Sequence, residues 1–125
     1  MELTTNGANN VSEFGSVKTE DGFRGLYAMS PYLHVKDGVR YPAVLVTTGI
    51  NDPRVDPWQP AKMVARLQAA DSGGKPILFR VDYDSGHGIG DTKQQRYERW
   101  ADAWSFLFWQ LGMPGFQPAA QQPQP

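Results

Sequence analysis

An aspartate and a histidine that follow glycine residues are the side chains of this sequence best suited to chemistry. Asp52 comes three residues after Gly49, and His87 stands between Gly86 and Gly88. An imidazole can remove a proton from a weak nucleophile, and a carboxylate beside it fixes the tautomer of the ring and stabilises the cation that forms. Asp52 and His87 fit these two roles if the fold brings them together.

The segments before these two residues predict how the fold does so. Residues 43–48 are apolar and β-branched without alternation, which is typical of a strand in a parallel sheet covered on both faces. Residues 77–81 predict a second strand, and residues 61–70 between them have the apolar spacing of a helix. Because a right-handed crossover places both strand ends at one edge of the sheet, we expect Asp52 and His87 to face each other.

Two more helices are expected outside this unit. Thr19 and the acidic residues after it predict a helix over 23–29, which Pro31 ends because the residue before a proline avoids the helical conformation. Residues 94–111 have the strongest helical periodicity of the chain. We expect the large aromatic side chains of this helix to be core residues and not a ligand site: Trp100, Trp104, Phe108 and Trp109.

Length and composition set the class of protein. A chain of 125 residues with 40% apolar residues is one domain, which we divide into an N-terminal arm (1–20), a folded part (21–112) and a flexible tail rich in Pro and Gln (113–125). The 12 basic and 13 acidic residues lack the positive excess that nucleic acid requires, and no apolar run reaches the length of a membrane span. With no cysteine, thiolate metal sites and a cysteine nucleophile are excluded.

The order and spacing of the two candidate residues narrow the chemistry. Aspartate followed by histidine, 35 residues later and across one helix and one strand, matches the last two members of an α/β-hydrolase triad. The surrounding segments are YPAVLVTTG at 41–49, DPRVDP at 52–57 and SGHG at 85–88, preceded by EFG, SPY and HVK at 13–15, 30–32 and 34–36. Taken together, residues 12–112 resemble the C-terminal part of the catalytic domain of the prolyl oligopeptidase family of serine peptidases.

This resemblance implies a fold and three site residues. The fold is α/β, a partial α/β-hydrolase with its last two parallel strands and their covering helices. Asp52 is implied as the triad acid, His87 as the general base and Arg54 as a contact to a substrate carbonyl. The family often has another acid after the triad aspartate, where this chain has Pro53.

A nucleophile is missing from this constellation. None of the six serines lies in a Gly-x-Ser-x-Gly turn, the strained strand-to-helix turn that exposes the nucleophile in such enzymes. Ser72 follows a predicted helix, and Ser85 lies near His87 without that turn, so neither is a good candidate. The oxyanion hole, which is built in part by the backbone N–H after the nucleophile, is lost with it.

Plainer interpretations of the same residues remain open. Asp52 could be only a turn former, His87 a loop histidine bound to backbone, and Arg54 a surface partner of Asp56. We expect His34 to be a surface or packing residue and not a metal ligand, because two histidines are too few for a typical zinc site. No cofactor is expected.

Two functional hypotheses follow. In the first, the chain is the C-terminal part of a serine peptidase, inactive alone and able to act on peptides only when an upstream segment completes it. In the second, it is a non-catalytic α/β module of that family that associates with itself. Self-association is expected in both, because two strands leave sheet edges without partners. A soluble chain of this kind fits the cytoplasm and the periplasm equally.

Overall fold

The computed structural model describes residues 2, 4 and 7–119, and the chain divides into two compact units, Met1–Ile89 and Gly90–Pro125. Each unit is described by itself. The last six residues of the predicted tail, 120–125, lie outside the described residues. None of the helices in the described part combines the length and the apolar character needed to cross a membrane.

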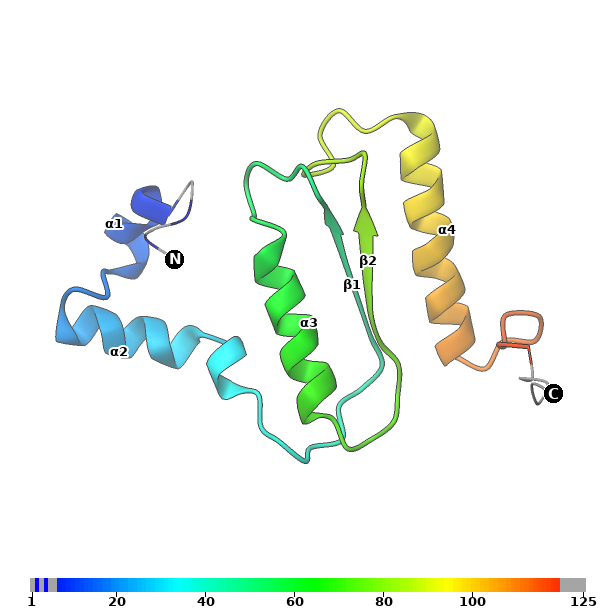
Figure 1. Ribbon diagram of the computed structural model, residues 1–125, viewed down its shortest axis with the longest axis horizontal. Coiled ribbons are helices and arrows are strands. Elements are labelled where there is room, and N and C mark those ends of the chain that lie inside the picture. Colours follow the sequence, from blue (N-terminus) through cyan, green and yellow to red (C-terminus); the bar gives the residue numbers. More distant parts are fainter. Residues whose placement is uncertain (1, 3, 5–6, 120–125) are drawn as a thin grey trace. The chain divides into compact units, whose positions relative to one another are not determined.

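The first unit is built on two parallel strands and the helix that joins them (Figure 1). Strand β1 (Val44–Gly49) pairs with β2 (Ile77–Asp82) in the register Val44↔Ile77 to Gly49↔Asp82. Helix α3 (Trp58–Ala70) makes the crossover between them. The predicted parallel pairing is confirmed, and the loops that follow both strands emerge at the same end of the sheet, as Figure 1 shows.

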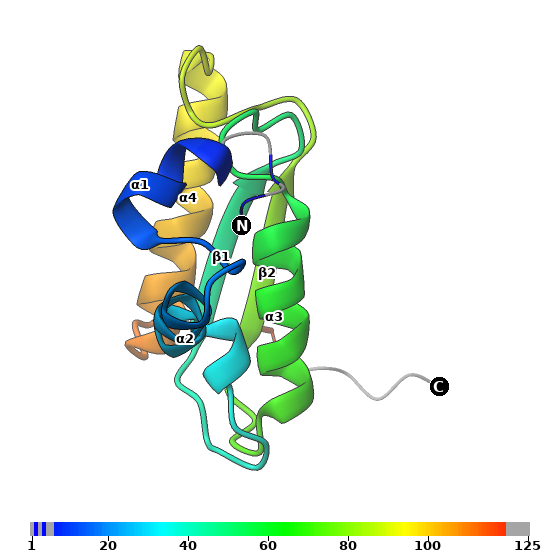
Figure 2. The ribbon, with the colours of Figure 1, turned by 90° about the vertical axis from the view of Figure 1, so that its left-hand side faces the viewer.

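The core of this unit lies between α3 and one face of the sheet, and Figures 1 and 2 show α3 running alongside both strands. Partly buried residues of both strands, among them Val46 and Phe79, pack against it. On the opposite face Leu78 is 41% exposed, and the expected cover of that face stays a prediction. The buried apolar side chains of the core are Val35, Val64, Leu67, Ala70 and Ile77.

Helix α3 begins at Trp58, three residues before the predicted start at 61. Apolar periodicity begins only in the second turn, whereas the first turn is made by Trp58, Gln59 and Pro60. Proline is tolerated there because the first N–H groups of a helix have no partner within it. At the other end, Asp71 takes an extended conformation and ends the helix.

The predicted N-terminal arm holds more structure than its composition suggested. A 3-10 helix η1 (Gly7–Asn10) runs into a short helix α1 (Val11–Phe14), and a longer helix α2 (Glu20–Met29) follows. Gly22 of α2 lies so close to the backbone of Ser16 that any Cβ there would collide with it. Residues 7–14 of the predicted arm are helical, and α1 contacts α2.

Thr19 caps helix α2 as predicted, with its hydroxyl accepting a hydrogen bond of 3.3 Å from the backbone N–H of Gly22. The helix begins at Glu20, three residues before the predicted start at 23. It ends at Met29, and Ser30 is extended before Pro31. A single 3-10 turn η2 (Tyr32–His34) then leads into the segment that reaches β1.

The second unit holds helix α4 (Lys93–Gln110), whose bounds lie within one residue of the prediction. The helix starts with a capping box. The backbone N–H of Gln95 donates to the Thr92 hydroxyl at 3.2 Å, and the backbone N–H of Thr92 donates to the side-chain Oε1 of Gln95 at 2.7 Å. The indoles of Trp100 and Trp104 stack along the helix but are 57% and 49% exposed. Within the second unit they contact aromatic neighbours on their own helix, and their expected core role stays a prediction.

Candidate active site

The structure brings Asp52 and His87 into direct contact. The Nδ1 atom of His87 lies 2.8 Å from Oδ2 of Asp52, within hydrogen-bond distance. The two residues follow the carboxyl ends of β1 and β2, so the parallel pairing of these strands places both loops at one edge. This is the placement that the crossover argument predicted.

Asp52 uses both oxygens of its carboxylate. Its Oδ1 atom accepts backbone N–H bonds from Arg54 at 2.8 Å and from Val55 at 3.0 Å, which forms the loop into an Asx turn. The Oδ2 atom is left to face His87, and the side chain is only 8% exposed. Asp52 is therefore not only a turn former, because it also contacts the imidazole of His87.

Backbone contacts hold the two loops against each other. The N–H of Ile50 donates to the carbonyl of Asp82 at 2.8 Å, and the N–H of Asn51 donates to the carbonyl of Ser85 at 3.2 Å. The side-chain amide of Asn51 also reaches the carbonyl of Tyr83, at 3.4 Å. These bonds continue the β1–β2 ladder past the last residues of the strands, so the loops that carry Asp52 and His87 are extensions of the sheet.

Gly49 makes this close approach possible. A Cβ atom on Gly49 would collide with the carbonyl oxygens of Ser85 and Gly86. Those two residues immediately precede His87, so any side chain at position 49 would push away the loop that carries the imidazole. The absence of a side chain at Gly49 is thus a condition for the contact between Asp52 and His87.

The surroundings of Asp52 favour its charged form. Burial alone raises the pKa of the carboxyl group, but hydrogen bonds from Val55, His87 and Arg54 together outweigh it, so the pKa of Asp52 lies below the ordinary value of 3.8. A carboxylate held ionised can orient the N–H at Nδ1 of His87 and leave Nε2 free to accept a proton. The imidazole is 39% exposed, so a reacting group can reach it.

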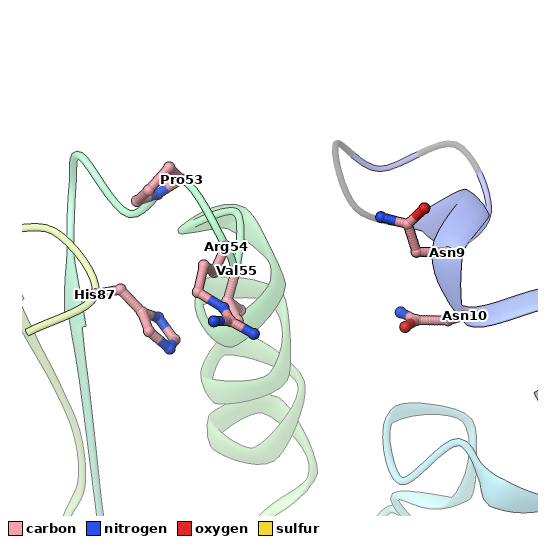
Figure 3. A pocket seen from close by; sticks show the side chains of 6 residues that line it. All are labelled: Asn9, Asn10, Pro53, Arg54, Val55 and His87. Atoms are coloured by element: carbon pink, nitrogen blue, oxygen red, sulfur yellow. The ribbon is translucent and has the colours of Figure 1, made fainter. Parts of the chain in front are cut away.

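A hollow of about 640 Å³ opens beside the imidazole, as Figure 3 shows. The side chains of Arg54 and His87 lie beside each other along it, and Asn10 faces them from η1 (Figure 3). The asparagines of η1 could not be found from the sequence, because they lie in a polar segment without periodicity. The residues that line the hollow are Asn9, Asn10, Pro53, Arg54, Val55 and His87.

The other candidate residues lie in structural contacts. The ring of His34 is 3.0 Å, at Nε2, from the carbonyl of Tyr27 and packs edge-on against the Tyr27 ring, which is the packing role that we expected. The Ser72 hydroxyl donates to the carbonyl of Gly38 at 2.8 Å. Ser85 is only 5% exposed and hydrogen-bonds to Asp82. Within residues 2, 4 and 7–119, no group of three or more acidic or histidine side chains is arranged to hold a metal ion.

The sequence that forms this site matches a known protein family. The model of the prolyl oligopeptidase family matches residues 3–114, which is most of the chain. The chain belongs to the prolyl oligopeptidase family. Within that family it corresponds to the C-terminal segment of the catalytic domain, as the motifs around Asp52 and His87 indicated.

Individual members of the family agree in sequence and in structure. The chain is 34% identical over 113 residues to dipeptidyl aminopeptidase BI of Pseudoxanthomonas mexicana and 37% identical over 110 residues to a prolyl endopeptidase of Dictyostelium discoideum. These matches cover 90% and 86% of this chain but only 15% and 14% of the two relatives. The chain therefore spans about one seventh of the length of these relatives.

Solved structures support the partial α/β-hydrolase fold. A chain from a structural study of two prolyl endopeptidases superposes with a TM-score of 0.83 at 36% identity, over 89% of this chain and 16% of its own. Prolyl oligopeptidase B of Galerina marginata gives a TM-score of 0.80 at 31% identity, over the same shares of the two chains. The predicted fold class is confirmed, and the two strands with their helices are a piece of that larger fold.

The Gly49→Ala substitution tests the close approach of the two loops. We expect the added methyl group to destabilise the folded state by about 1–3 kcal/mol, since it overpacks against two carbonyl groups, and to separate Asp52 from His87. Chemical denaturation measures the first effect, and the ¹⁵N chemical shifts of His87 report the second. The matched control is Gly25→Ala in the exposed part of α2, where nothing lies near the added Cβ. A Gly49→Ala variant as stable as the Gly25→Ala variant contradicts the close approach.

The lowered pKa of Asp52 predicts how stability depends on pH. A carboxyl group whose folded-state pKa is depressed stabilises the fold above its unfolded pKa, here near 3.8, and this contribution disappears as pH falls through the folded-state pKa. The difference in melting temperature between the wild type and Asp52→Asn should therefore be largest near about pH 6 and shrink below the unfolded pKa. Melting curves across this range test it, and a difference that stays constant with pH is inconsistent with the assigned hydrogen bonds.

Proposed function

We propose that this chain carries the acid and the base of a serine peptidase relay, with Asp52 orienting His87 and His87 moving the proton. The observation that carries the proposal is the 2.8 Å contact between Oδ2 of Asp52 and Nδ1 of His87. It leaves Nε2 as the proton acceptor, on a ring that borders the hollow. Membership of the prolyl oligopeptidase family supports the same assignment.

The reaction would be acyl transfer in two steps. In the first, a serine hydroxyl attacks the peptide carbonyl, its proton passes to Nε2 of His87, and the imidazolium then gives that proton to the departing amine. In the second, His87 takes a proton from water, the hydroxide attacks the acyl group, and the serine oxygen leaves with the proton returned to it. Asp52 stabilises the imidazolium in both steps without becoming protonated.

The serine is the part that this sequence does not provide. Since none of its serines lies in a Gly-x-Ser-x-Gly turn, we propose that an upstream segment of the catalytic domain carries the nucleophile and the oxyanion hole. The 125 residues alone are then inactive. The substrate is a peptide, and Arg54 contacts one of its carbonyl groups. The prolyl endopeptidases among the relatives support a preference for proline.

Complementation tests this proposal. We expect the chain, mixed or fused with an upstream catalytic segment that carries the serine turn, to hydrolyse a peptide substrate. His87→Ala and Asp52→Asn should each lower kcat by at least about a thousandfold, because the relay acts as one unit. His34→Ala is the matched control and should keep its activity, since that imidazole contacts Tyr27 and not the relay.

Three outcomes contradict the proposal. The first is full activity of the complemented His87→Ala variant, which removes the base from the mechanism. The second is stoichiometric labelling of the 125-residue chain alone by a fluorophosphonate, which reveals a nucleophile within it. A wild-type chain that folds with the upstream segment but yields no hydrolysis also counts against the relay.

A second candidate function is a non-catalytic module that associates with itself. The observation that favours it is the two-stranded sheet: in the described residues each strand pairs on one side only, and the register places Leu45 beside Leu78 on the face away from α3. Such a sheet is marginal without further cover. A second copy of the chain could cover this face and pair with the open strand edge.

Sedimentation velocity over a range of concentrations tests this second candidate. We expect dimers or larger assemblies, together with a shift toward monomer for Leu78→Lys, which puts a charge on the exposed part of that face. The matched control is Leu33→Lys, an exposed leucine in η2 outside the sheet. A wild-type chain that sediments as a single monomeric species at every concentration rules out self-association.

A further inference from the structure

Asp82 is the last residue of β2, five positions before His87, and its contacts reach both loops of the candidate site. We propose that Asp82 is a positioning residue: its carboxylate shapes the loop that carries His87, so that Nδ1 of the imidazole faces Asp52. The value of this role for catalysis rests on the proposed function. The geometric role stands on the contacts of Asp82 itself.

The carboxylate of Asp82 gathers the donors of its own loop. Its Oδ1 atom accepts the backbone N–H of Asp84 at 3.0 Å, and the backbone and hydroxyl of Ser85 also hydrogen-bond to it. The guanidinium of Arg80 lies 3.6 Å away, with Nη1 facing Oδ2. Both charged side chains are largely buried, at 19% exposed for Arg80 and 13% for Asp82. The first turn after β2 is thus folded around one carboxylate.

The backbone of the same residue holds the facing loop. The carbonyl of Asp82 accepts the N–H of Ile50, at 2.8 Å, two residues before Asp52. Ser85, which the carboxylate anchors, uses its own carbonyl to accept the N–H of Asn51 at 3.2 Å. Asp82 therefore connects to the Asp52 loop directly through its carbonyl and indirectly through Ser85. A loss of the carboxylate releases Ser85, and with it Gly86, which leads to His87.

These contacts require a carboxylate and not merely a polar side chain. An ionised carboxylate offers two oxygens that only accept, whereas an asparagine offers one acceptor and one donor. The surrounding groups are all donors: the N–H of Asp84, the Ser85 groups and the guanidinium of Arg80. In an Asp82→Asn variant, the amide nitrogen would point its N–H groups at other donors. This isosteric change should therefore also loosen the loop.

The experiment uses the full 125-residue chain and reads the position of the proton on His87. In basic solution, where the imidazole is neutral, the ¹⁵N shifts of its two ring nitrogens tell the Nδ1–H tautomer from the Nε2–H tautomer. The wild type should be held in the Nδ1–H form by Asp52. In Asp82→Asn and Asp82→Ala, we expect a mixture of the two tautomers, with the larger change in the alanine variant.

Asp71→Ala is the matched control. Asp71 also caps a turn of the same unit, where it accepts the N–H of Tyr41 at 2.8 Å and the N–H of Gly74 at 2.9 Å. Its removal should lower the melting temperature as the Asp82 variants do, but it should leave the His87 tautomer as in the wild type. This contrast separates a local effect on the imidazole from a general loss of stability.

Three results would overturn the positioning role. Folded Asp82→Asn and Asp82→Ala variants that keep the wild-type tautomer show that the loop does not need the carboxylate. An Asp71→Ala variant that disturbs His87 equally shows that only overall stability matters. If neither Asp82 variant folds, Asp82 is a residue of the fold as a whole. None of these outcomes depends on peptide hydrolysis. The positioning role of Asp82 can therefore fail while the proposed function stands, and the proposed function can fail while the positioning role stands.

Discussion

The pairing of Asp52 with His87 depends on the close approach of Gly49, which has no side chain, to the loop that carries His87. Gly49 ends β1 directly against the carbonyl groups of Ser85 and Gly86, at a separation that excludes even a methyl group. The backbone bonds from Ile50 and Asn51 then carry the sheet register into both loops. Aspartate and histidine are brought together by the main chain, and their side chains complete a geometry that is already set.

This arrangement gives a short segment the two contacting side chains of the proposed relay. The polar groups of the site are satisfied locally: Asp52 binds the N–H groups of its own turn, and Asp82 binds those of the turn before His87. Preorganised groups of this kind need little rearrangement when charge develops on the imidazole. The matching segment makes up only 14–16% of its relatives, yet it contains the glycine, the turns and the backbone bonds that orient His87 toward Asp52.

The frame of the site was predictable from the sequence because its signals are local and strong. Apolar β-branched runs, a crossover helix between them and the handedness of that crossover are enough, by themselves, to place Asp52 opposite His87. The cap at Thr19 and the bounds of α4 also followed from local chemistry. The family resemblance was carried by the segments around these same residues, and the family match confirms it.

What the sequence did not predict arises from contacts between distant residues. Residues 7–14 form short helices in a segment without periodicity, and Asn10 lines the hollow together with residues of the loops that follow β1 and β2. Periodicity identified the face of α4 that carries Trp100, but periodicity says which side chains share a face and not what covers that face. The pattern of one helix does not say which distant segment covers its apolar face.

Backbone hydrogen bonds help to hold the two loops together, and the amide protons that make them can show whether they do. Amide hydrogen exchange of the 125-residue chain, followed by NMR at Ile50 and Asn51, measures this most directly. We expect both amides to exchange as slowly as the paired amides of β1 and β2, because they donate to Asp82 and Ser85. Exchange at the rate of an open loop at these two positions, while the strand amides stay protected, would contradict it.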